Sequence, residues 1–134
     1  MVYFQWQAPE QYTEAAELSE KSDVYSLGNV LYYLLTEGTK PFHGMEGEAA
    51  FRHVSHGHRP RITNPKILNS THPFHVNIMQ AIQMCWVHDP HERPDARKVR
   101  DFLRPHLDAH LDNRTKAGDL NVKNGRYRLT SSSE

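Results

Sequence analysis

The side chains in this sequence best suited to hold a metal ion are its ten histidines and its one cysteine. Two groups of histidines stand close in the sequence, namely His53, His56 and His58, and the pair His106 and His110. An i, i+4 spacing can place two zinc ligands on one face of a helix. Structural zinc sites usually include several cysteines, however, and the pair follows Pro105, where a helix should fray. We therefore predict no metal site.

The single cysteine, Cys85, lies beside Trp86 on the apolar face of a predicted helix. A cysteine in such surroundings is usually a small buried residue and not a reactive nucleophile. One cysteine allows no intrachain disulfide, which favours a reducing compartment. The first residues show no basic region followed by an apolar run, as a secretory signal would. We therefore expect a cytoplasmic protein.

Composition and charge narrow the choice of partners. The chain has 134 residues, of which 37% are hydrophobic and 24% charged, which suits one soluble globular domain. Lys and Arg number 16, as do Asp and Glu, so the net charge is zero. Proteins that bind nucleic acid or a membrane surface usually carry a basic excess. We expect neither nucleic acid nor a membrane as a partner.

Hydrophobic periodicity predicts four helical segments, and no convincing strand pattern is present. The first covers about residues 23–37, with Ser22 as N-cap and Gly38 at its C-terminal turn. Apolar residues occupy nearly its whole circumference, which is typical of a buried helix. The others cover about residues 46–55 and 75–86 and a segment that starts at Asp95. Pro105 should break or kink that last helix, with a final turn reaching about Leu111.

The end of the chain differs from the rest. Few large apolar residues follow Asn113, and the chain ends in Thr-Ser-Ser-Ser-Glu. Such a segment buries too little surface to offset the entropy lost on ordering. We therefore predict an all-α fold of four helices around one buried central helix, in a domain of residues 1–111. Residues 112–134 would form a polar, disordered tail.

Three motifs occur in a fixed order. Residues 6–10 read Trp-Gln-Ala-Pro-Glu, residues 21–28 read Lys-Ser-Asp-Val-Tyr-Ser-Leu-Gly, and residues 85–94 read Cys-Trp-Val-His-Asp-Pro-His-Glu-Arg-Pro. They resemble the A-P-E, D-x-W/Y-S-x-G and C-W-x-x-D-P-x-x-R-P motifs of eukaryotic-type protein kinases, in the same order and spacing. The sequence thus resembles the C-terminal lobe of a protein kinase domain from the A-P-E motif onward, over about residues 6–107.

The resemblance implies roles for particular residues. Glu10 and Arg93 would form a structural ion pair across more than eighty residues, for which the planar fork of arginine is well suited. The alternative is two unrelated surface charges. Asp23 would anchor the catalytic loop to the central helix, or simply favour the helix N-terminus. The substrate-side loop would contain Tyr3, Gln5 and Trp6, which depart from the residues usual there.

The resemblance also implies that the parts binding ATP and transferring phosphate come before the A-P-E motif. Only seven residues precede Ala8. Residues 101–103 read Asp-Phe-Leu and not Asp-Phe-Gly, and residues 58–60 read His-Arg-Pro and not His-Arg-Asp. We therefore expect no catalytic, cofactor-binding or metal-binding residues in this chain. ATP and magnesium would belong to a longer protein, of which the chain is a fragment or a truncated gene product.

The implied function is that of the substrate-side lobe of an enzyme that moves the γ-phosphate of ATP to protein Ser/Thr, or Tyr, hydroxyls, with Ser/Thr preferred. The partners would be a protein substrate or docking partner and the missing N-terminal lobe and catalytic loop. Without that loop, part of residues 24–35 should be an exposed apolar patch. One alternative is a non-catalytic pseudokinase lobe or helical docking module. Another is an unrelated small helical interaction domain.

Overall fold

The computed structural model describes residues 4–15, 17–118, 120–123 and 126–129. Within them the chain forms the helices α1 (Glu20–Leu35), α2 (Gly47–Ser55), α3 (Pro65–Leu68), α4 (Pro73–Cys85) and α5 (Ala96–Lys116). Two short 3-10 turns, η1 (Phe4–Trp6) and η2 (Pro9–Tyr12), come first. An antiparallel hairpin of β1 (Leu120–Lys123) and β2 (Arg126–Leu129) comes last.

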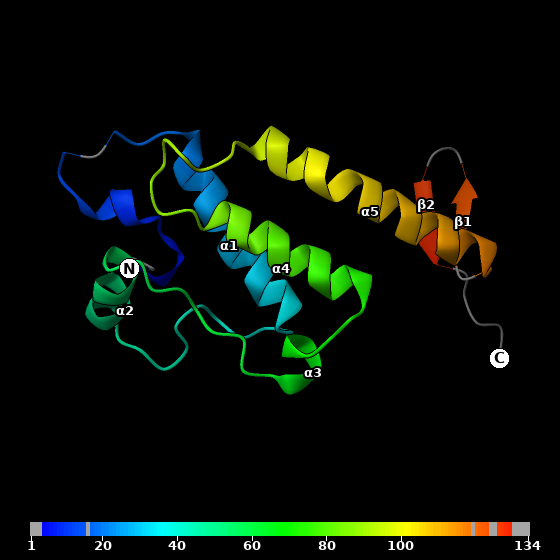
Figure 1. The fold of residues 1–134 in the computed structure, drawn as a ribbon, viewed down its shortest axis with the longest axis horizontal. Coiled ribbons are helices and arrows are strands. Elements are labelled where there is room, and N and C mark those ends of the chain that lie inside the picture. Colours follow the sequence, from blue (N-terminus) through cyan, green and yellow to red (C-terminus); the bar gives the residue numbers. More distant parts are fainter. Residues whose placement is uncertain (1–3, 16, 119, 124–125, 130–134) are drawn as a thin grey trace.

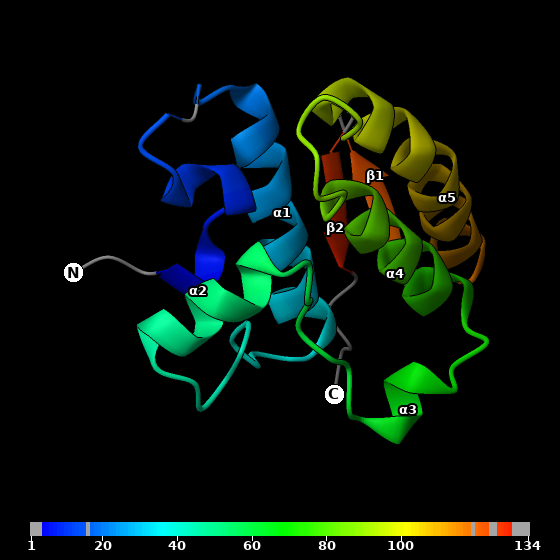
Figure 2. The ribbon, with the colours of Figure 1, turned by 60° about the vertical axis from the view of Figure 1, so that its left-hand side comes forward.

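The three long helices form the body of the molecule (Figure 1). Helix α4 packs against α1 on one side and against α5 on the other. Helix α2 packs against η1 and η2, and these three elements lie on the side of α1 away from α4 and α5 (Figure 2). One buried cluster joins the three long helices through Val24, Ala81, Cys85 and Val99. A larger cluster joins α1 and α4 to α2 and the loops. The helical fold class expected from the sequence is confirmed in the described part of the chain.

Gly28 sets the distance between α1 and α4. A Cβ atom built on Gly28 would lie 2.7 Å from the Cβ of Cys85 and 2.8 Å from the indole ring of Trp86. Side-chain atoms do not approach one another so closely, so only glycine allows the two helices to come this near. The glycine of the D-x-W/Y-S-x-G motif therefore acts here by making room for the Trp86 ring.

Helix α1 begins three residues earlier than the sequence indicated. Ser19 is the N-cap, and its Oγ accepts a hydrogen bond of 3.2 Å from the backbone N–H of Lys21. The expected N-cap, Ser22, lies inside the helix and is buried, with its hydroxyl donating to Glu10. The prediction was wrong because both serines are followed by an acidic residue, as helix N-caps often are, and only the fold shows that Ser22 has a tertiary partner.

Pro105 does not interrupt α5, which runs unbroken from Ala96 to Lys116. The prediction of a break or of an end near Leu111 was wrong. A proline inside a helix removes one backbone hydrogen bond, here the one to the carbonyl of Asp101. Both Pro105 and Asp101 are exposed, so water can satisfy that carbonyl. Asp95, by contrast, is the N-cap as predicted, with its carboxylate accepting from the N–H of Lys98 at 2.8 Å.

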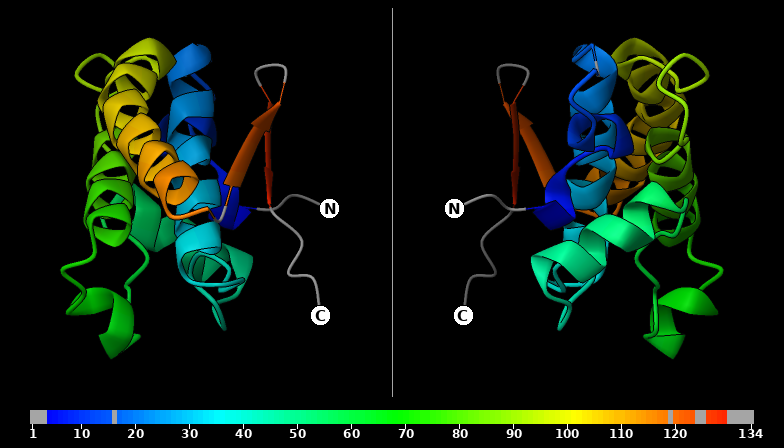
Figure 3. Two further views of the ribbon diagram at one scale, coloured as in Figure 1. Left: turned by 90° about the vertical axis from the view of Figure 1, so that its right-hand side faces the viewer. Right: turned by 90° about the vertical axis from the view of Figure 1, so that its left-hand side faces the viewer.

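The end of the chain also differs from the prediction of a tail without structure. Strand β1 pairs with β2 in a register that places Leu120 opposite Leu129, and β1 contacts α5. The hairpin stands to one side of the helices (Figure 3). Both strands alternate apolar and polar residues, and the sequence between them is Asn124-Gly125, a dipeptide typical of hairpin connections. This signal was present in the sequence but is short. The domain boundary at residue 111 stays a prediction.

We expect Gly28→Ala to lower the free energy of unfolding by about 1–3 kcal/mol, because the added methyl group overpacks the contact between α1 and α4. The loss should appear although alanine favours a helix over glycine by about 1 kcal/mol. Urea denaturation measures it. Leu34→Ala, at an exposed position of the same helix, should change stability by less than about 0.5 kcal/mol. A Gly28→Ala protein as stable as the parent would contradict the packing argument.

Candidate functional site

The structure brings Glu10 and Arg93 together. Arg93 lies in the segment between α4 and α5, and only 1% of its surface is exposed. Its Nη1 donates to Oε1 of Glu10 at 2.7 Å and its Nη2 donates to Oε2 at 3.0 Å. This is the two-bond geometry in which the guanidinium fork matches a carboxylate. We call this pair and its hydrogen-bond partners the Glu10–Arg93 clamp.

The remaining hydrogens of Arg93 reach backbone carbonyl groups. Nε donates to the carbonyl of Val87 at 2.8 Å, Nη1 to that of Lys21 at 2.6 Å, and Nη2 to that of His88 at 3.0 Å. A guanidinium has five N–H donors, and here each has an acceptor. A buried charge is tolerated when it is both paired and fully hydrogen bonded. The clamp thereby joins η2, the start of α1 and the loop between α4 and α5.

Glu10 has a second donor, the hydroxyl of Ser22, at 3.0 Å from its Oε1. Burial alone would raise the pKa of Glu10, but the hydrogen bonds from Arg93 and Ser22 and the charge of Arg93 outweigh burial and lower it. The carboxylate is therefore the stable form at neutral pH. The ammonium group of Lys21 adds a further tie by donating to the carbonyl oxygen of Arg93.

Tyr25, the aromatic residue of the second motif, lies between two guanidinium groups. The Cζ atom of Arg93 is 5.0 Å and that of Arg59 5.1 Å from the centre of its ring, which suits cation–π attraction. Burial raises the pKa of Tyr25 to about 12, although both arginines act to lower it. The hydroxyl of Tyr25 is buried, and among the described residues nothing hydrogen bonds to it.

Arg59 was not singled out from the sequence, where it appeared only in the His-Arg-Pro triplet. In the structure its Nε and Nη2 donate to the carbonyl of Trp86 at 3.0 and 2.8 Å. It therefore ties the loop after α2 to the end of α4. An isolated arginine in a loop carries no sequence signal for such a contact, because its partner is a backbone atom 27 residues away.

The predicted substrate-side loop is held on α1 by buried polar groups. The carbonyl of Trp6 accepts hydrogen bonds from Ser26 Oγ at 2.9 Å and Asn29 Nδ2 at 3.0 Å. The Oδ1 atom of Asn29 in turn accepts from the indole N–H of Trp86 at 3.1 Å. Asn29 thus connects η1 to the end of α4. The sequence analysis did not assign a role to Asn29. A lone amide side chain inside an apolar helix is, however, a signal for a buried hydrogen-bond partner.

The remaining residues predicted for the substrate-side loop and for the anchor of the catalytic loop make fewer contacts. Gln5 lies in η1 and is half-buried, and the ring of Trp6 meets that of Tyr33 edge-on at 6.0 Å. Tyr3 lies outside the described residues. Asp23 is exposed in the first turn of α1, where a negative charge favours the helix N-terminus. Its role as an anchor for a catalytic loop stays a prediction.

The candidate metal ligands and the cysteine take other places. Among residues 4–15, 17–118 and the two strands, no three His, Cys, Asp or Glu side chains come together as metal ligands would. Cys85 is buried between α1 and α4, and burial raises the pKa of its thiol to about 11. A thiol that is inaccessible and protonated at neutral pH does not act as a nucleophile.

The described residues leave one side of α1 partly exposed. We call it the open face of α1, and it consists of Leu27, Val30, Tyr33 and Leu34, which are 36, 44, 38 and 65% exposed. The opposite side carries the buried residues that pack on α4 and share a buried cluster with α2. Contiguous apolar residues on a surface usually mark a place where another protein segment binds. The exposed patch that the sequence predicted within residues 24–35 is therefore present.

A helical lobe built on one central helix, with an Ala-Pro-Glu segment clamped by a buried arginine, is the class of structure expected for the larger lobe of a protein kinase. The comparisons agree, because the family model described as protein tyrosine and serine/threonine kinase matches residues 1–103. The chain belongs to this family. No described helix is long and apolar enough to cross a membrane.

Similar proteins include three tyrosine kinases. Human protein-tyrosine kinase 6 is 32% identical over 100 residues, which are 75% of this chain and 20% of that protein. Mouse tyrosine-protein kinase Srms is 33% identical over 98 residues, 73% of this chain and 18% of that protein. Drosophila melanogaster tyrosine-protein kinase Src64B is 37% identical over 90 residues, 66% of this chain and 15% of that protein. The chain spans about a fifth, or less, of the length of these relatives.

We expect Arg93→Ala to cost about 3–5 kcal/mol of stability, because it leaves the buried Glu10 carboxylate without its partner. Thermal denaturation at neutral pH measures the loss. Arg100→Ala is the matched control, since Arg100 pairs only with its neighbour Asp101 and both side chains are largely exposed. That variant should lie within about 0.5 kcal/mol of the parent. Equal effects of the two substitutions would refute the clamp.

We expect Tyr25→Phe to be neutral or slightly stabilising, because it removes a buried hydroxyl that has no acceptor among the described residues. Tyr32→Phe should instead cost about 1 kcal/mol, since the hydroxyl of Tyr32 donates to the carbonyl of Arg61 at 2.8 Å. Both substitutions keep the ring, so chemical denaturation of the two variants isolates the hydroxyl. A larger loss for Tyr25→Phe than for Tyr32→Phe would contradict this assignment.

Proposed function

We propose that this chain is the substrate-side lobe of a protein kinase. The complete enzyme transfers the γ-phosphoryl group of ATP to a hydroxyl group of a protein substrate. The chain alone does not catalyse this transfer, because it is a fragment that lacks the ATP site and the catalytic loop. It supplies the rigid base on which the substrate-side loop and the catalytic loop are held.

The Glu10–Arg93 clamp is the observation that carries this proposal. Phosphoryl transfer depends on positioning and on electrostatic stabilisation, so the loop that receives the substrate must be fixed in place. The clamp fixes the Ala-Pro-Glu segment to α1 and to the loop before α5 by five charge-assisted hydrogen bonds. Asn29 and Ser26 hold the carbonyl of Trp6, just before that segment, to the same helix.

The open face of α1 supports the idea that more of the kinase domain binds here. Its four apolar residues are 36 to 65% exposed, although the Trp6 ring of η1 meets Tyr33 at the edge of this face. Asp23 is exposed at the start of the same helix, where it is available to a neighbouring segment. We infer that the catalytic loop and the helix upstream of it cover this face in the complete protein.

Tyrosine is the acceptor that we propose. The sequence alone led us to prefer Ser/Thr, but the similar proteins reported above carry tyrosine kinase in their names. The partners are then a protein substrate with an acceptor hydroxyl, or a docking protein, together with the N-terminal lobe of the kinase. A cytoplasmic location fits the single buried thiol, which is stable in a reducing compartment.

We propose that ATP and magnesium are bound by parts of the kinase domain outside this chain. A kinase holds magnesium through an Asp of a D-F-G motif and an Asn of the catalytic loop. Neither motif occurs in the 134 residues, and no described cluster of three metal-ligating side chains replaces them. We therefore assign both ligands to the complete protein and derive no step through them here.

The test compares this chain with the complete product of its coding sequence. We expect the complete product to transfer phosphate from Mg-ATP to a tyrosine-containing peptide. The 134-residue chain should show neither this activity nor micromolar binding of an ATP analogue. A folded complete product without activity would contradict this proposal and favour the alternative of a non-catalytic docking module. Micromolar ATP binding by the short chain would refute the proposal that the ATP site lies outside it.

A matched pair of substitutions in the complete product tests the cover over α1. Val30→Asp, on the open face, should abolish activity and lower the melting temperature, because it buries an unpaired charge. The same substitution in the short chain should be nearly neutral, since Val30 is exposed there. Leu68→Asp, on exposed α3, is the control and should leave both forms unchanged. Equal effects of Val30→Asp in the two forms would contradict the cover.

A further inference from the structure

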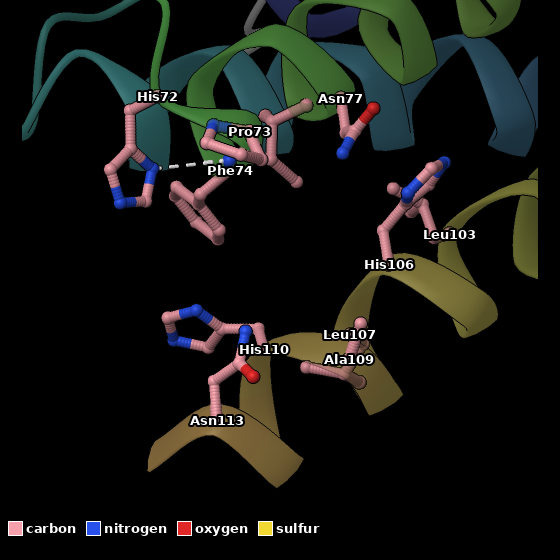
Figure 4. A pocket seen from close by; sticks show the side chains of 11 residues that line it. His72, Pro73, Phe74, Asn77, Leu103, His106, Leu107, Ala109, His110 and Asn113 are labelled. Atoms are coloured by element: carbon pink, nitrogen blue, oxygen red, sulfur yellow. Dashed lines mark hydrogen bonds between the residues drawn. The ribbon is translucent and has the colours of Figure 1, made fainter. Parts of the chain in front are cut away.

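Four histidines gather where the second half of α5 passes the first turn of α4. A groove of about 480 Å³ separates the two helices there, with His72 and Phe74 on one side and His106 and His110 on the other (Figure 4). The fourth histidine, His75, stacks near His72 with ring centres 5.6 Å apart. None of these residues takes part in the Glu10–Arg93 clamp.

His72 is the N-cap of α4. Its Nδ1 atom accepts a hydrogen bond from the backbone N–H of Phe74 at 3.2 Å, the dashed line of Figure 4. Ser, Thr, Asp and Asn usually hold this position, and each keeps an acceptor oxygen at pH 5 to 7. An imidazole nitrogen accepts only while it carries no proton. The cap on α4 therefore exists only in the neutral form of His72.

Further contacts hold the residues next to His72 in place. Its backbone N–H donates to the hydroxyl oxygen of Ser70 at 3.1 Å, and that oxygen lies 2.7 Å from Nδ1 of His75. The ring of Phe74 is 6.0 Å from that of His75 and 6.3 Å from that of His110. Phe74 thus links the capped turn to the second half of α5.

Among the described residues that line the groove, none carries a negative charge that would compensate a proton added to His72. The first turn of α4 contains no acidic residue, and the groove lining contains no Asp, Glu, Lys or Arg. The ring of His75 on α4 lies 5.6 Å from that of His72, and His106 and His110 on α5 line the other side of the groove. The N-terminal end of a helix is itself partially positive, which opposes a cation at the cap.

We propose that His72 is a proton-operated cap that couples pH to the contact between Phe74 on α4 and His110 on α5. Above the range in which imidazoles titrate, near pH ~6.5, His72 accepts from Phe74 and the first turn of α4 is closed. Below it, the protonated ring releases the N–H of Phe74 and repels the neighbouring imidazoles. The turn then opens and Phe74 loses its contact with His110.

Amide hydrogen exchange at pH 7.5 and 5.5 tests the proposal on the full chain. After correction for the intrinsic effect of pH, the amides of Phe74 and Val76 should exchange about fivefold faster at pH 5.5, the value of one lost cap of ~1 kcal/mol. The carbonyl of His72 accepts from the amide of Val76 at 3.1 Å, so that amide reports the same turn. Amides in the middle of α1 should not change.

His72→Asn separates the cap from a general effect of acid, because asparagine caps a helix at both pH values. It should abolish the fivefold difference, whereas His43→Asn, at an exposed histidine of the loop before α2, should keep it. A difference that persists in His72→Asn would overturn the proposal. If that variant does not fold, NMR titration of the parent decides. The Phe74 amide must shift together with the ring of His72, and independent titrations would equally overturn it.

Discussion

The guanidinium group of Arg93 carries a permanent charge at a place that water does not reach. A buried charge is stable only when its donors are matched by acceptors, and these acceptors come from three distant parts of the chain. The Ala-Pro-Glu turn, the start of α1 and the loop after α4 must therefore meet at one point. The positions of α1, α4 and α5 follow from this requirement together with the apolar clusters that they share.

The interruptions in the apolar run of α1 give the helix its specific contacts. Apolar residues alone would allow α1 to rotate or slide against its neighbours with small changes in energy. Asn29 and Ser26 permit one orientation only, because both must reach the carbonyl of Trp6. Gly28 allows the Trp86 ring to lie where its indole N–H meets Asn29. The polar and small residues thus determine how α1 sits, while the apolar residues supply most of the burial.

The sequence predicted most of the helices, because helical periodicity is a local signal, whereas the meeting of Glu10 with Arg93 was implied by the resemblance to protein kinases. It placed the start of α1 at Ser22 because capping rules do not show that Ser22 has a buried partner. Arg59, Asn29 and the cap at His72 were missed because their partners are backbone or ring atoms that only the fold brings near. The hairpin after α5 depends on two four-residue strands, which are too short for a strong periodic signal. Pro105 stays inside a helix because its lost hydrogen bond faces water.

The separation of Glu10 and Arg93 by 83 positions has a consequence for the order in which the chain acquires its structure. Helix α1 is local and can form within microseconds of leaving the ribosome, whereas a contact of such long range must wait for the intervening segment. During synthesis Glu10 and Asn29 are therefore available to solvent until the loop after α4 has emerged. A nascent chain that ends before that loop lacks Arg93 and the packing around it, and intermediates with such exposed apolar surface are the species on which chaperones act.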